Sequence, residues 1–234
     1  IDSKAFSVVR LSKIYRQAES SHIVLNAHKI NAGELITLDN KNKDFFFFEK
    51  KDVRSVMGAL VYLVKTRLPE YIGASPFEIQ VLTPMRKGEL GVEHLNEVLQ
   101  YYLNPASESK KEKEGRTGVF REGDKVMQVK NNYKLEWKIT NAKGFSIEEG
   151  LGVFNGDMGI IKQINTYSER ITVVFDENRE AEYPFSSLDE LELAYAITIH
   201  KSQGSEYPAV VLPLLSGPPI LCNRNLLYTA ITRA

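Results

Sequence analysis

The chain has 234 residues, 43% hydrophobic and 26% charged, which is the composition of an ordinary globular protein. Its 30 basic residues balance 30 acidic ones, so the bulk charge indicates no polyanionic partner and any nucleic-acid site must be a local patch. The single cysteine, Cys222, excludes an internal disulfide and a multi-thiolate metal site. Because no apolar run approaches the ~18 residues of a membrane span and no signal-peptide pattern opens the chain, we expect a cytoplasmic protein with no membrane partner.

Both ends resemble cuts within a longer polypeptide. The chain begins at Ile1, already inside an apolar segment, and stops directly after "LLYTAITRA". We therefore expect a segment of a larger protein.

The first fifty residues contain one helical and one strand-like pattern. Apolar residues at 23, 24, 27 and 30, followed by Gly33, predict a short amphipathic helix with a glycine stop. The run Phe45–Phe48 suits a strand buried on both faces. An aromatic platform for stacking bases is the alternative interpretation of this run.

Alternating helical and strand patterns then predict an α/β domain. Apolar residues at 53, 56, 57, 60, 61, 64 and 68 indicate a helix packed on a sheet. Residues 77–84 resemble a strand that ends at Pro84, and residues 92–103 a second helix. Such an order is typical of a parallel sheet with helical crossovers.

A change of pattern marks an inserted domain. Residues 104–116 are charged and resemble a flexible surface linker, and short strands with Gly-Asp and Asn-Gly-Asp turns follow. Ile171, Val173 and Phe175 alternate on one face of one such strand. We expect a small antiparallel barrel.

Apolar strand character returns in "LELAYAITIH" and in residues 208–214, and a helix begins near residue 226. We therefore divide the chain into a first part of an α/β domain (1–116), an inserted barrel (117–187) and the remainder of the α/β domain (188–234).

The richest polar segment is "AYAITIHKSQGSE", residues 194–206. It follows an apolar strand, and in open α/β sheets ligands gather at the carboxyl ends of the strands. Hydroxyl, imidazole and ammonium groups can donate to phosphate oxygens, Gly204 permits close backbone approach, and Glu206 can accept from a sugar hydroxyl. Taken alone, the segment is better explained as a polar loop with a satisfied histidine and a solvated lysine.

Two arginines add to this inventory. Arg16 lies beside Tyr15, which could stack on a base, and Arg233 lies one turn into the last predicted helix. A guanidinium aimed at a phosphate stabilises the charge that develops during phosphoryl transfer. Each arginine taken singly is more typical of a solvated surface.

Four segments in order, "RLSKIYRQA", "VLTPMRKGELGVEHLN", "ITIHKSQGSEYPAVVLPL" and "NLLYTAITRA", resemble the second half of a superfamily-one DNA helicase. The RecD type, related to the exodeoxyribonuclease V alpha subunit, is the most similar, and the resemblance covers nearly the whole chain. It implies a RecA-like parallel sheet flanked by helices, with an inserted SH3-like β-barrel that helps to grip single-stranded DNA.

The resemblance also assigns roles to residues of helicase motifs IV, V and VI. Tyr15 would lie near the adenine and Arg16 at the γ-phosphate, Glu206 at the ribose, and Arg233 would be the arginine finger. The implied sets are Arg16 and Arg233 as catalytic residues; Tyr15, Gln203, Gly204 and Glu206 as nucleotide-binding residues; and Thr83, Asn96, Thr198, His200 and Lys201 as DNA-binding residues. Lys125, Lys130 and Lys134 of the insert are DNA candidates by charge alone, and a solvated face explains them equally well.

One part of the family pattern is missing. The sequence contains no G-x-x-x-x-G-K-[ST] loop, and Asp189 and Glu190 precede motif V, the wrong place for the pair that holds Mg²⁺. The resemblance places both features in a first RecA-like domain, expected upstream of Ile1. We therefore expect ATP and Mg²⁺ as cofactors of the whole enzyme, none held by this chain alone, and no ATP hydrolysis by the isolated chain.

The function expected from the resemblance is that of an ATP-dependent 5′–3′ DNA helicase of recombination and repair, with single-stranded DNA, ATP and the upstream domain as partners. A non-catalytic nucleic-acid or protein binding module built around the barrel is the alternative. A relative that acts on RNA is a third possibility, which a preference for the 2′-OH would reveal.

Overall fold

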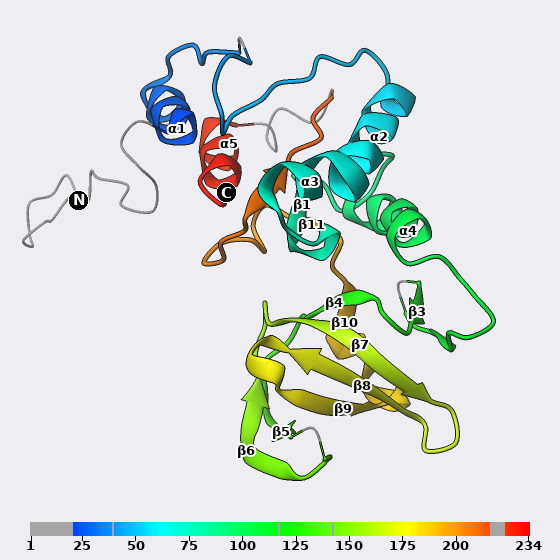
Figure 1. Cartoon of the computed structure of the whole chain (residues 1–234). Helices are drawn as coiled ribbons and strands as arrows, with labels where there is room; N and C mark the ends of the chain where they lie inside the picture. Colours follow the sequence, from blue (N-terminus) through cyan, green and yellow to red (C-terminus); the bar gives the residue numbers. More distant parts are fainter. Residues whose placement is uncertain (1–20, 39, 117, 142, 216–222) are drawn as a thin grey trace, which may run out of the picture. The chain divides into compact units, whose positions relative to one another are not determined.

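The computed structural model describes residues 21–38, 40–116, 118–141, 143–215 and 223–234 (Figure 1). The chain divides into two units, residues 1–49 and 50–234. Within the described part of the first unit, helix α1 (His22–Ala32) begins where the Ser21 side chain accepts a hydrogen bond from the Ile23 N–H. It ends at Gly33, whose φ of 78° is left-handed. The predicted helix with its glycine stop is confirmed.

The phenylalanine run does not form the predicted buried strand. Phe46, Phe47 and Phe48 are 40%, 44% and 54% exposed. The Asn40 side chain donates to the Phe47 carbonyl (2.7 Å) and accepts from the Phe47 N–H (2.6 Å). A side-chain amide thus takes the place of a partner strand, and a loop results.

The second unit contains a three-stranded parallel sheet in the order β11-β1-β12. Its strands are β1 (Ile79–Thr83), β11 (Ala196–Thr198) and β12 (Ala209–Val211). Thr83 lies opposite Thr198 at the carboxyl end. The predicted parallel sheet is confirmed, although β12 is shorter than the predicted strand 208–214 and only half-buried.

Helices cover this sheet. They are α2 (Val53–Tyr62), the π-helical turn η1 (Leu63–Arg67), α3 (Leu68–Ile72), the 3₁₀ turn η2 (Pro76–Glu78), α4 (Val92–Leu103) and α5 (Arg224–Ile231). From α2 to α3 the chain stays helical. The π turn lies next to Pro69, which has no N–H to continue a regular helical ladder.

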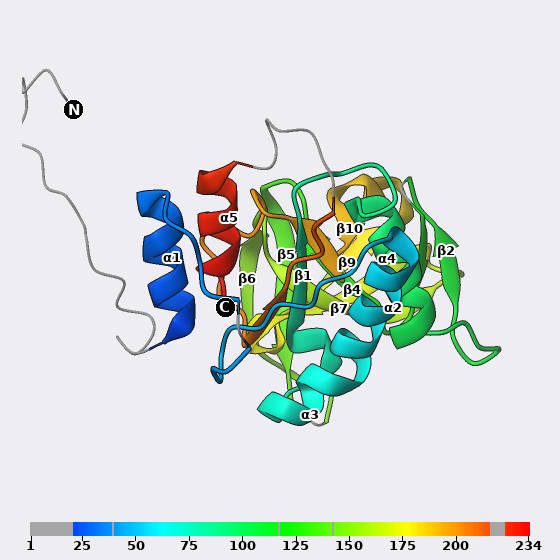
Figure 2. The ribbon, with the colours of Figure 1, turned by 90° about the horizontal axis from the view of Figure 1, so that it is seen from above.

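Both faces of the parallel sheet are buried, as Figure 2 shows for β1 between α5 and the helices α2 and α4. Ile79 and Val81 pack in one cluster with residues of α2 and α4, including Leu60 and Leu95. On the other face, Leu82 packs with Leu226 and Ala230 of α5. A fully buried leucine side chain contributes about 2 kcal/mol to the stability of the fold. The helical period of the apolar residues and the alternation of side chains in β1 therefore determine which faces pack together.

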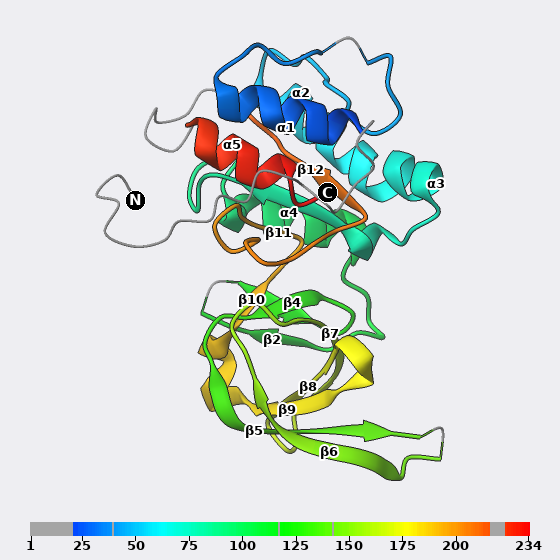
Figure 3. The same ribbon diagram turned by 90° about the vertical axis from the view of Figure 1, so that its left-hand side faces the viewer.

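Seven further strands form an antiparallel sheet in the order β10-β4-β7-β8-β9-β5-β6, with the long β5–β6 hairpin visible in Figure 3. The strands are β4 (Lys125–Gln128), β5 (Asn132–Thr140), β6 (Ser146–Val153), β7 (Met158–Asn165), β8 (Arg170–Phe175), β9 (Glu180–Pro184) and β10 (Leu191–Leu193). The 3₁₀ turns η3 (Asp176–Asn178) and η4 (Phe185–Glu190) follow β8 and β9.

The predicted alternation of β8 is confirmed, because Ile171, Val173 and Phe175 are all buried. Among the described residues, β10 and β6 are the edges of the sheet, and no pairing closes it into the predicted barrel. The structure thus shows an antiparallel insert but not its closure.

The predicted linker 104–116 is more ordered than its composition suggests. Its last part contains β2 (Glu112–Glu114), which pairs with β3 (Val119–Arg121). Its first residue, Asn104, is 3% exposed and donates to the Asp124 carboxylate at 2.7 Å. A charged composition alone did not reveal these contacts.

The apolar run "LELAYAIT" serves both sheets. Its first part, β10, pairs antiparallel with β4, and its second part, β11, pairs parallel with β1. The antiparallel sheet therefore extends past residue 187, and the boundaries drawn from the sequence stay predictions. Asn96 of α4 fixes the short link between β10 and β11, which we call the crossover. Its amide donates to the carbonyls of Leu193 and Ala196, both at 3.0 Å, and accepts from the Ala196 N–H at 2.8 Å.

A buried lysine lies close to the crossover, in the region between the two sheets that we call the junction. Lys125, at the start of β4, is 7% exposed and donates to the Phe77 carbonyl (2.7 Å) and to the Gln80 side chain (2.9 Å). Desolvation lowers the pKa of this ammonium to about 8. Gln80 also donates to the carbonyls of Ala194 and Tyr195, so β1, β4 and the crossover share one polar cluster.

Asp124 completes the junction. Its fully buried carboxylate accepts hydrogen bonds from Gln100, Asn104, Tyr195 and the Arg121 N–H, at 2.6 to 2.9 Å. Burial raises the pKa of Asp124, and these hydrogen bonds oppose the rise. Every polar group named at the junction has a partner, which is the condition for burying such groups between two sheets.

Candidate functional site

The carboxyl ends of β1 and β11 carry the polar loop that the sequence singled out. Thr83 and Thr198 are neighbours across the two strands, and the Ile199 N–H donates to the Thr83 carbonyl at 3.1 Å. The loop that follows Thr198 therefore starts at the sheet edge where the sequence predicted a ligand.

The loop is a tight turn with its own internal support. The fully buried Ser202 donates its hydroxyl to the Ile199 carbonyl at 2.7 Å, and the Lys201 N–H donates to the Thr198 carbonyl at 3.0 Å. Gly204 has a φ of 93°, a left-handed conformation that glycine adopts without strain. Because Ser202 points inward, His200 and Gln203 are left exposed to solvent.

Arg233 lies against the late part of this loop. Its guanidinium donates to the Ser205 carbonyl at 3.2 Å, and its own carbonyl accepts from the Tyr207 N–H at 2.9 Å. Helix α5 sets this position, because Asn223 caps its first turn and Leu226 packs on the sheet. The structure thus brings Arg233 together with the segment that contains Gly204 and Glu206.

Lys201 is held at the early part of the loop by an acidic side chain. Its ammonium lies 3.1 Å from a Glu192 carboxylate oxygen, and Arg86 reaches the other oxygen at 2.6 Å. Burial alone would raise the pKa of Glu192, but the hydrogen bonds from Arg86 and Lys201 outweigh it and lower that pKa. Arg86 and Glu192 were missed at the sequence level, and the basic pair in "TPMRKGE" was the one available signal.

Thr83 and Asn96 do not face solvent. The Thr83 hydroxyl is fully buried and donates to the Leu90 carbonyl at 2.6 Å. Asn96 is 5% exposed, and its amide is used by the crossover described above. In this structure both side chains hold the protein's own backbone.

The other expected residues divide in three ways. Tyr15 and Arg16 lie outside the described residues. Lys125 is buried, so neither a solvated face nor a DNA contact describes it. Lys130 is bonded to Asp189, and Lys134 is exposed.

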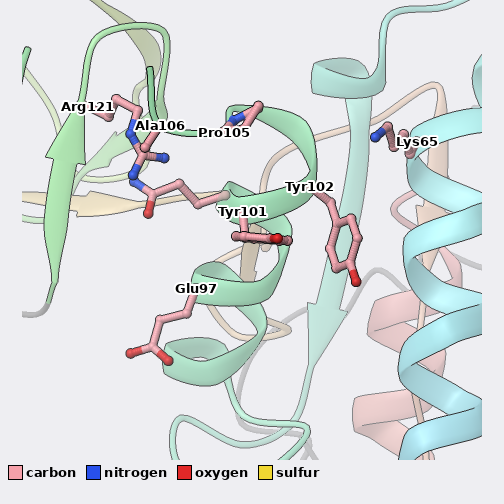
Figure 4. A pocket seen from close by; sticks show the side chains of 8 residues that line it. Lys65, Glu97, Tyr101, Tyr102, Pro105, Ala106 and Arg121 are labelled. Atoms are coloured by element: carbon pink, nitrogen blue, oxygen red, sulfur yellow. The ribbon is translucent and has the colours of Figure 1, made fainter. Parts of the chain in front are cut away.

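A separate cavity of about 600 Å³ lies at the far end of α4 (Figure 4). Tyr101 and Tyr102 meet there edge to face, with ring centroids 5.1 Å apart, and Lys65 lies 5.9 Å from the Tyr102 ring. Since α4 starts near the carboxyl end of β1 and runs away from it, this cavity is not part of the loop site.

Within the described residues, no cluster of three His, Cys, Asp or Glu side chains could hold a metal ion. No helix in the same part of the chain is both long and apolar enough to span a membrane.

Two family models match the chain. Residues 95–175 match the SH3 domain of ATP-dependent RecD-like DNA helicases, and residues 193–234 match the UvrD-like helicase C-terminal domain. The first match covers most of α4 and most of the antiparallel sheet, and the second covers the polar loop and α5.

Curated relatives agree with these matches. The ATP-dependent RecD2 DNA helicase of Deinococcus radiodurans is 33% identical over 232 residues, which are 99% of this chain and 28% of that protein. The RecBCD enzyme subunit RecD of Mycolicibacterium smegmatis is 31% identical over 157 residues, 67% of this chain and 24% of that protein. The chain therefore spans about a quarter of the length of these two relatives.

A solved structure shares the fold. The crystal structure of a Pif1 helicase from Bacteroides in complex with ADP-AlF3 and ssDNA matches with a TM-score of 0.53 and 19% identity. The match covers 97% of this chain and 50% of that one. This likeness concerns the fold alone. The family models and the curated relatives show that this chain is similar to the RecD-type DNA helicases over nearly its whole length.

Proposed function

We propose that this chain is the second RecA-like motor domain, with its SH3-like insert, of an ATP-dependent DNA helicase that moves 5′ to 3′. The observation that carries the proposal is the loop after β11. Its early residue Lys201 is tied to Glu192 and Arg86, while its late residue Ser205 is bonded to Arg233. One short loop thus has Lys201 and Arg86 at its early part and Arg233 at its late part, as a domain that binds both a strand and a nucleotide requires.

The late part of the loop is assigned to the nucleotide. Gln203, Gly204 and Glu206 would face the nucleotide, with Glu206 at the ribose, and Arg233 would approach the γ-phosphate from the turn that follows α5. Tyr15 and Arg16 are proposed for the adenine and the γ-phosphate on the strength of the motif alone. A guanidinium in this place stabilises charge that grows as the phosphoryl group is transferred.

The early part of the loop is assigned to the DNA backbone, with Thr198, His200 and Lys201 as donors. Thr83 and Asn96 support these donors, because their buried side chains fix the loop after β1 and the start of β11. The antiparallel insert is proposed as an SH3-like barrel that guides the strand, which the match to the RecD-like SH3 model supports.

A phosphate-binding loop and the carboxylates for Mg²⁺ are proposed to come from a first RecA-like domain of the same protein. The 234-residue sequence has no G-x-x-x-x-G-K-[ST] loop. The described residues offer no metal cluster, and no step through Mg²⁺ is assigned to them. ATP would then bind between two domains, and a change in the loop on ATP binding would alter the grip on DNA.

The test uses the full-length protein with Arg233→Ala. DNA-stimulated ATP turnover is expected to fall by about 10³-fold or more, as for other transition-state arginines, while ATP binding changes little. Arg224→Ala, at the exposed start of α5, the helix that precedes Arg233, is the matched control and should keep full turnover. Unchanged turnover in Arg233→Ala would remove the finger role. Absence of any ATPase in the unsubstituted protein would favour a non-catalytic binding module.

A further inference from the structure

A cleft of about 490 Å³ lies between the loop after β1 and the start of β10. Its lining residues are Arg86, Lys87, Glu93, Arg116, Asp189, Leu191 and Glu192. The cleft adjoins the polar loop, because Lys201 of that loop bonds the Glu192 carboxylate at 3.1 Å. None of the lining residues was assigned a role by the motifs.

The segment that presents Arg86 and Lys87 is held rigidly by backbone contacts. The Val92 N–H donates to the Met85 carbonyl (3.0 Å), and the Glu93 N–H donates to the Arg86 carbonyl (3.2 Å). A Cβ at Gly91 would lie 2.5 Å from the Lys87 carbonyl carbon, so only glycine fits there. The two basic side chains therefore project from a fixed loop, which lowers the entropy cost of binding a ligand.

The charges of the cleft are arranged in two groups. The Glu192 carboxylate is shared by Arg86 and Lys201, and Asp189 is bonded to Lys130. Within the described residues, the exposed Lys87 and Arg116 have no ion-pair partner at 4.0 Å or less. Arg86 also lies 3.4 Å from Glu93, and the charge of Arg116 helps to lower the pKa of Asp189. The cleft thus presents cations whose carboxylate partners an incoming anion could replace, together with Lys87, which has no ion pair among the described residues.

We propose that this cleft binds a backbone phosphate of single-stranded DNA, and that Glu192 occupies the place of that phosphate when no strand is bound. The proposal rests on the proposed function, since it takes the strand as the ligand. Carboxylate and phosphate offer similar paired oxygens to a guanidinium, so Arg86 can exchange one for the other while its charge stays paired.

The exchange has a consequence for the loop. Lys201 and Arg86 hold Glu192 of β10, so the polar loop is tied to the antiparallel sheet through one carboxylate. Entry of a phosphate transfers both cations to the strand and frees Glu192. Lys87, which has no such competitor among the described residues, would contact the strand from the start, and Arg116 would add a contact beside Asp189.

The test measures fluorescence anisotropy of a labelled oligodeoxythymidylate with the 234-residue chain across a series of salt concentrations. Lys87→Ala and Arg116→Ala should each weaken binding by about two- to fivefold, as expected for the loss of one exposed ion pair. Each should also reduce the slope of log affinity against log salt by about 0.7, the value for one lost phosphate contact. Glu192→Gln should tighten binding several-fold, because the competing charge is gone.

Lys65→Ala is the matched control, since it removes the same charge from an exposed position at the far end of α4. Equal effects of Lys87→Ala, Arg116→Ala and Lys65→Ala would overturn the phosphate site while leaving the proposed function in place. Unchanged or weaker binding by a Glu192→Gln chain with an unaltered melting temperature would overturn the exchange. A wild-type chain that shows no salt-dependent binding of the oligonucleotide would contradict both proposals.

Discussion

Lys125 provides a test of how the junction between the two sheets is held. The perturbation is Lys125→Met, which keeps an unbranched side chain one atom shorter and removes the ammonium. In the structure that ammonium is buried and donates to the Phe77 carbonyl and the Gln80 side chain. Loss of the ammonium leaves these two acceptors unpaired, so the pH dependence of stability is a clearer measure than stability at one pH.

The size of this pH dependence follows from the difference in the pKa of Lys125 between the folded and the unfolded chain. The ordinary pKa of a lysine is 10.5, and burial lowers the pKa of Lys125 to about 8 in the folded chain. Below about pH 8 the amine is charged in both states, and the folded state bears the full cost of the buried charge. Between the two pKa values the unfolded chain binds more protons, so stability rises with pH. For this lysine alone, the free energy of unfolding should rise by about 2 kcal/mol from about pH 8 to about pH 10.

The assay is urea unfolding of both chains at several pH values in this window. Burial also raises the pKa of Tyr183 and of Tyr195, so these two phenols ionise first in the unfolded chain above about pH 10. Measurements therefore stop below that point. The wild type should gain about 2 kcal/mol relative to Lys125→Met, whereas Lys134→Met, an exposed change in the same sheet, should follow the wild type. If the free energy of unfolding changed with pH in the same way in the wild type and in Lys125→Met, Lys125 would not be a buried lysine with a lowered pKa.

Two further predictions concern stability. Asn96→Ala should lower the free energy of unfolding by about 3 kcal/mol, because three backbone groups of the crossover lose their partner. Thermal denaturation measures this loss, and the exposed Asn225→Ala is the control; equal melting temperatures would show that the crossover does not depend on Asn96. Gly204→Ala should cost about 1 kcal/mol, since φ is 93° while the space around the residue is open. An unchanged melting temperature for Gly204→Ala would mean that the loop relaxes to another conformation.

The layers of the α/β domain could be predicted because they depend on local periodicity. The spacing in α2 and α4 and the apolar strand β1 specify which faces are buried, and the buried leucines Leu60, Leu95 and Leu99 confirm them. Gly33 likewise marks a helix end, because a left-handed residue is a local requirement. Patterns of this kind involve only residues that are close together in the sequence, so the sequence alone reveals them.

Features that depend on a distant partner could not be predicted. The run Phe45–Phe48 is as apolar as a buried strand, but its backbone pairs with the Asn40 side chain instead of with a strand. "LELAYAIT" has the pattern of one strand, yet it divides between two sheets. Its first residues pair with β4 and its last residues pair with β1. For the same reason, the motif gave Asn96 a ligand role without revealing its three backbone contacts.

The contacts of the loop after β11 also depend on distant partners, and they bear on the proposed coupling between ATP binding and DNA binding. The two cationic side chains tied to the loop after β11 are both held by internal acceptors: Lys201 by the Glu192 carboxylate and Arg233 by the Ser205 carbonyl. A carboxylate competes far more strongly with a phosphate than a neutral carbonyl does. Under the proposed function, Lys201 must therefore lose a charged partner before it can contact a phosphate of the strand. Replacing Glu192 should consequently change the affinity for DNA more than the affinity for ATP, and equal changes in both would contradict the assignment of the two ends of the loop.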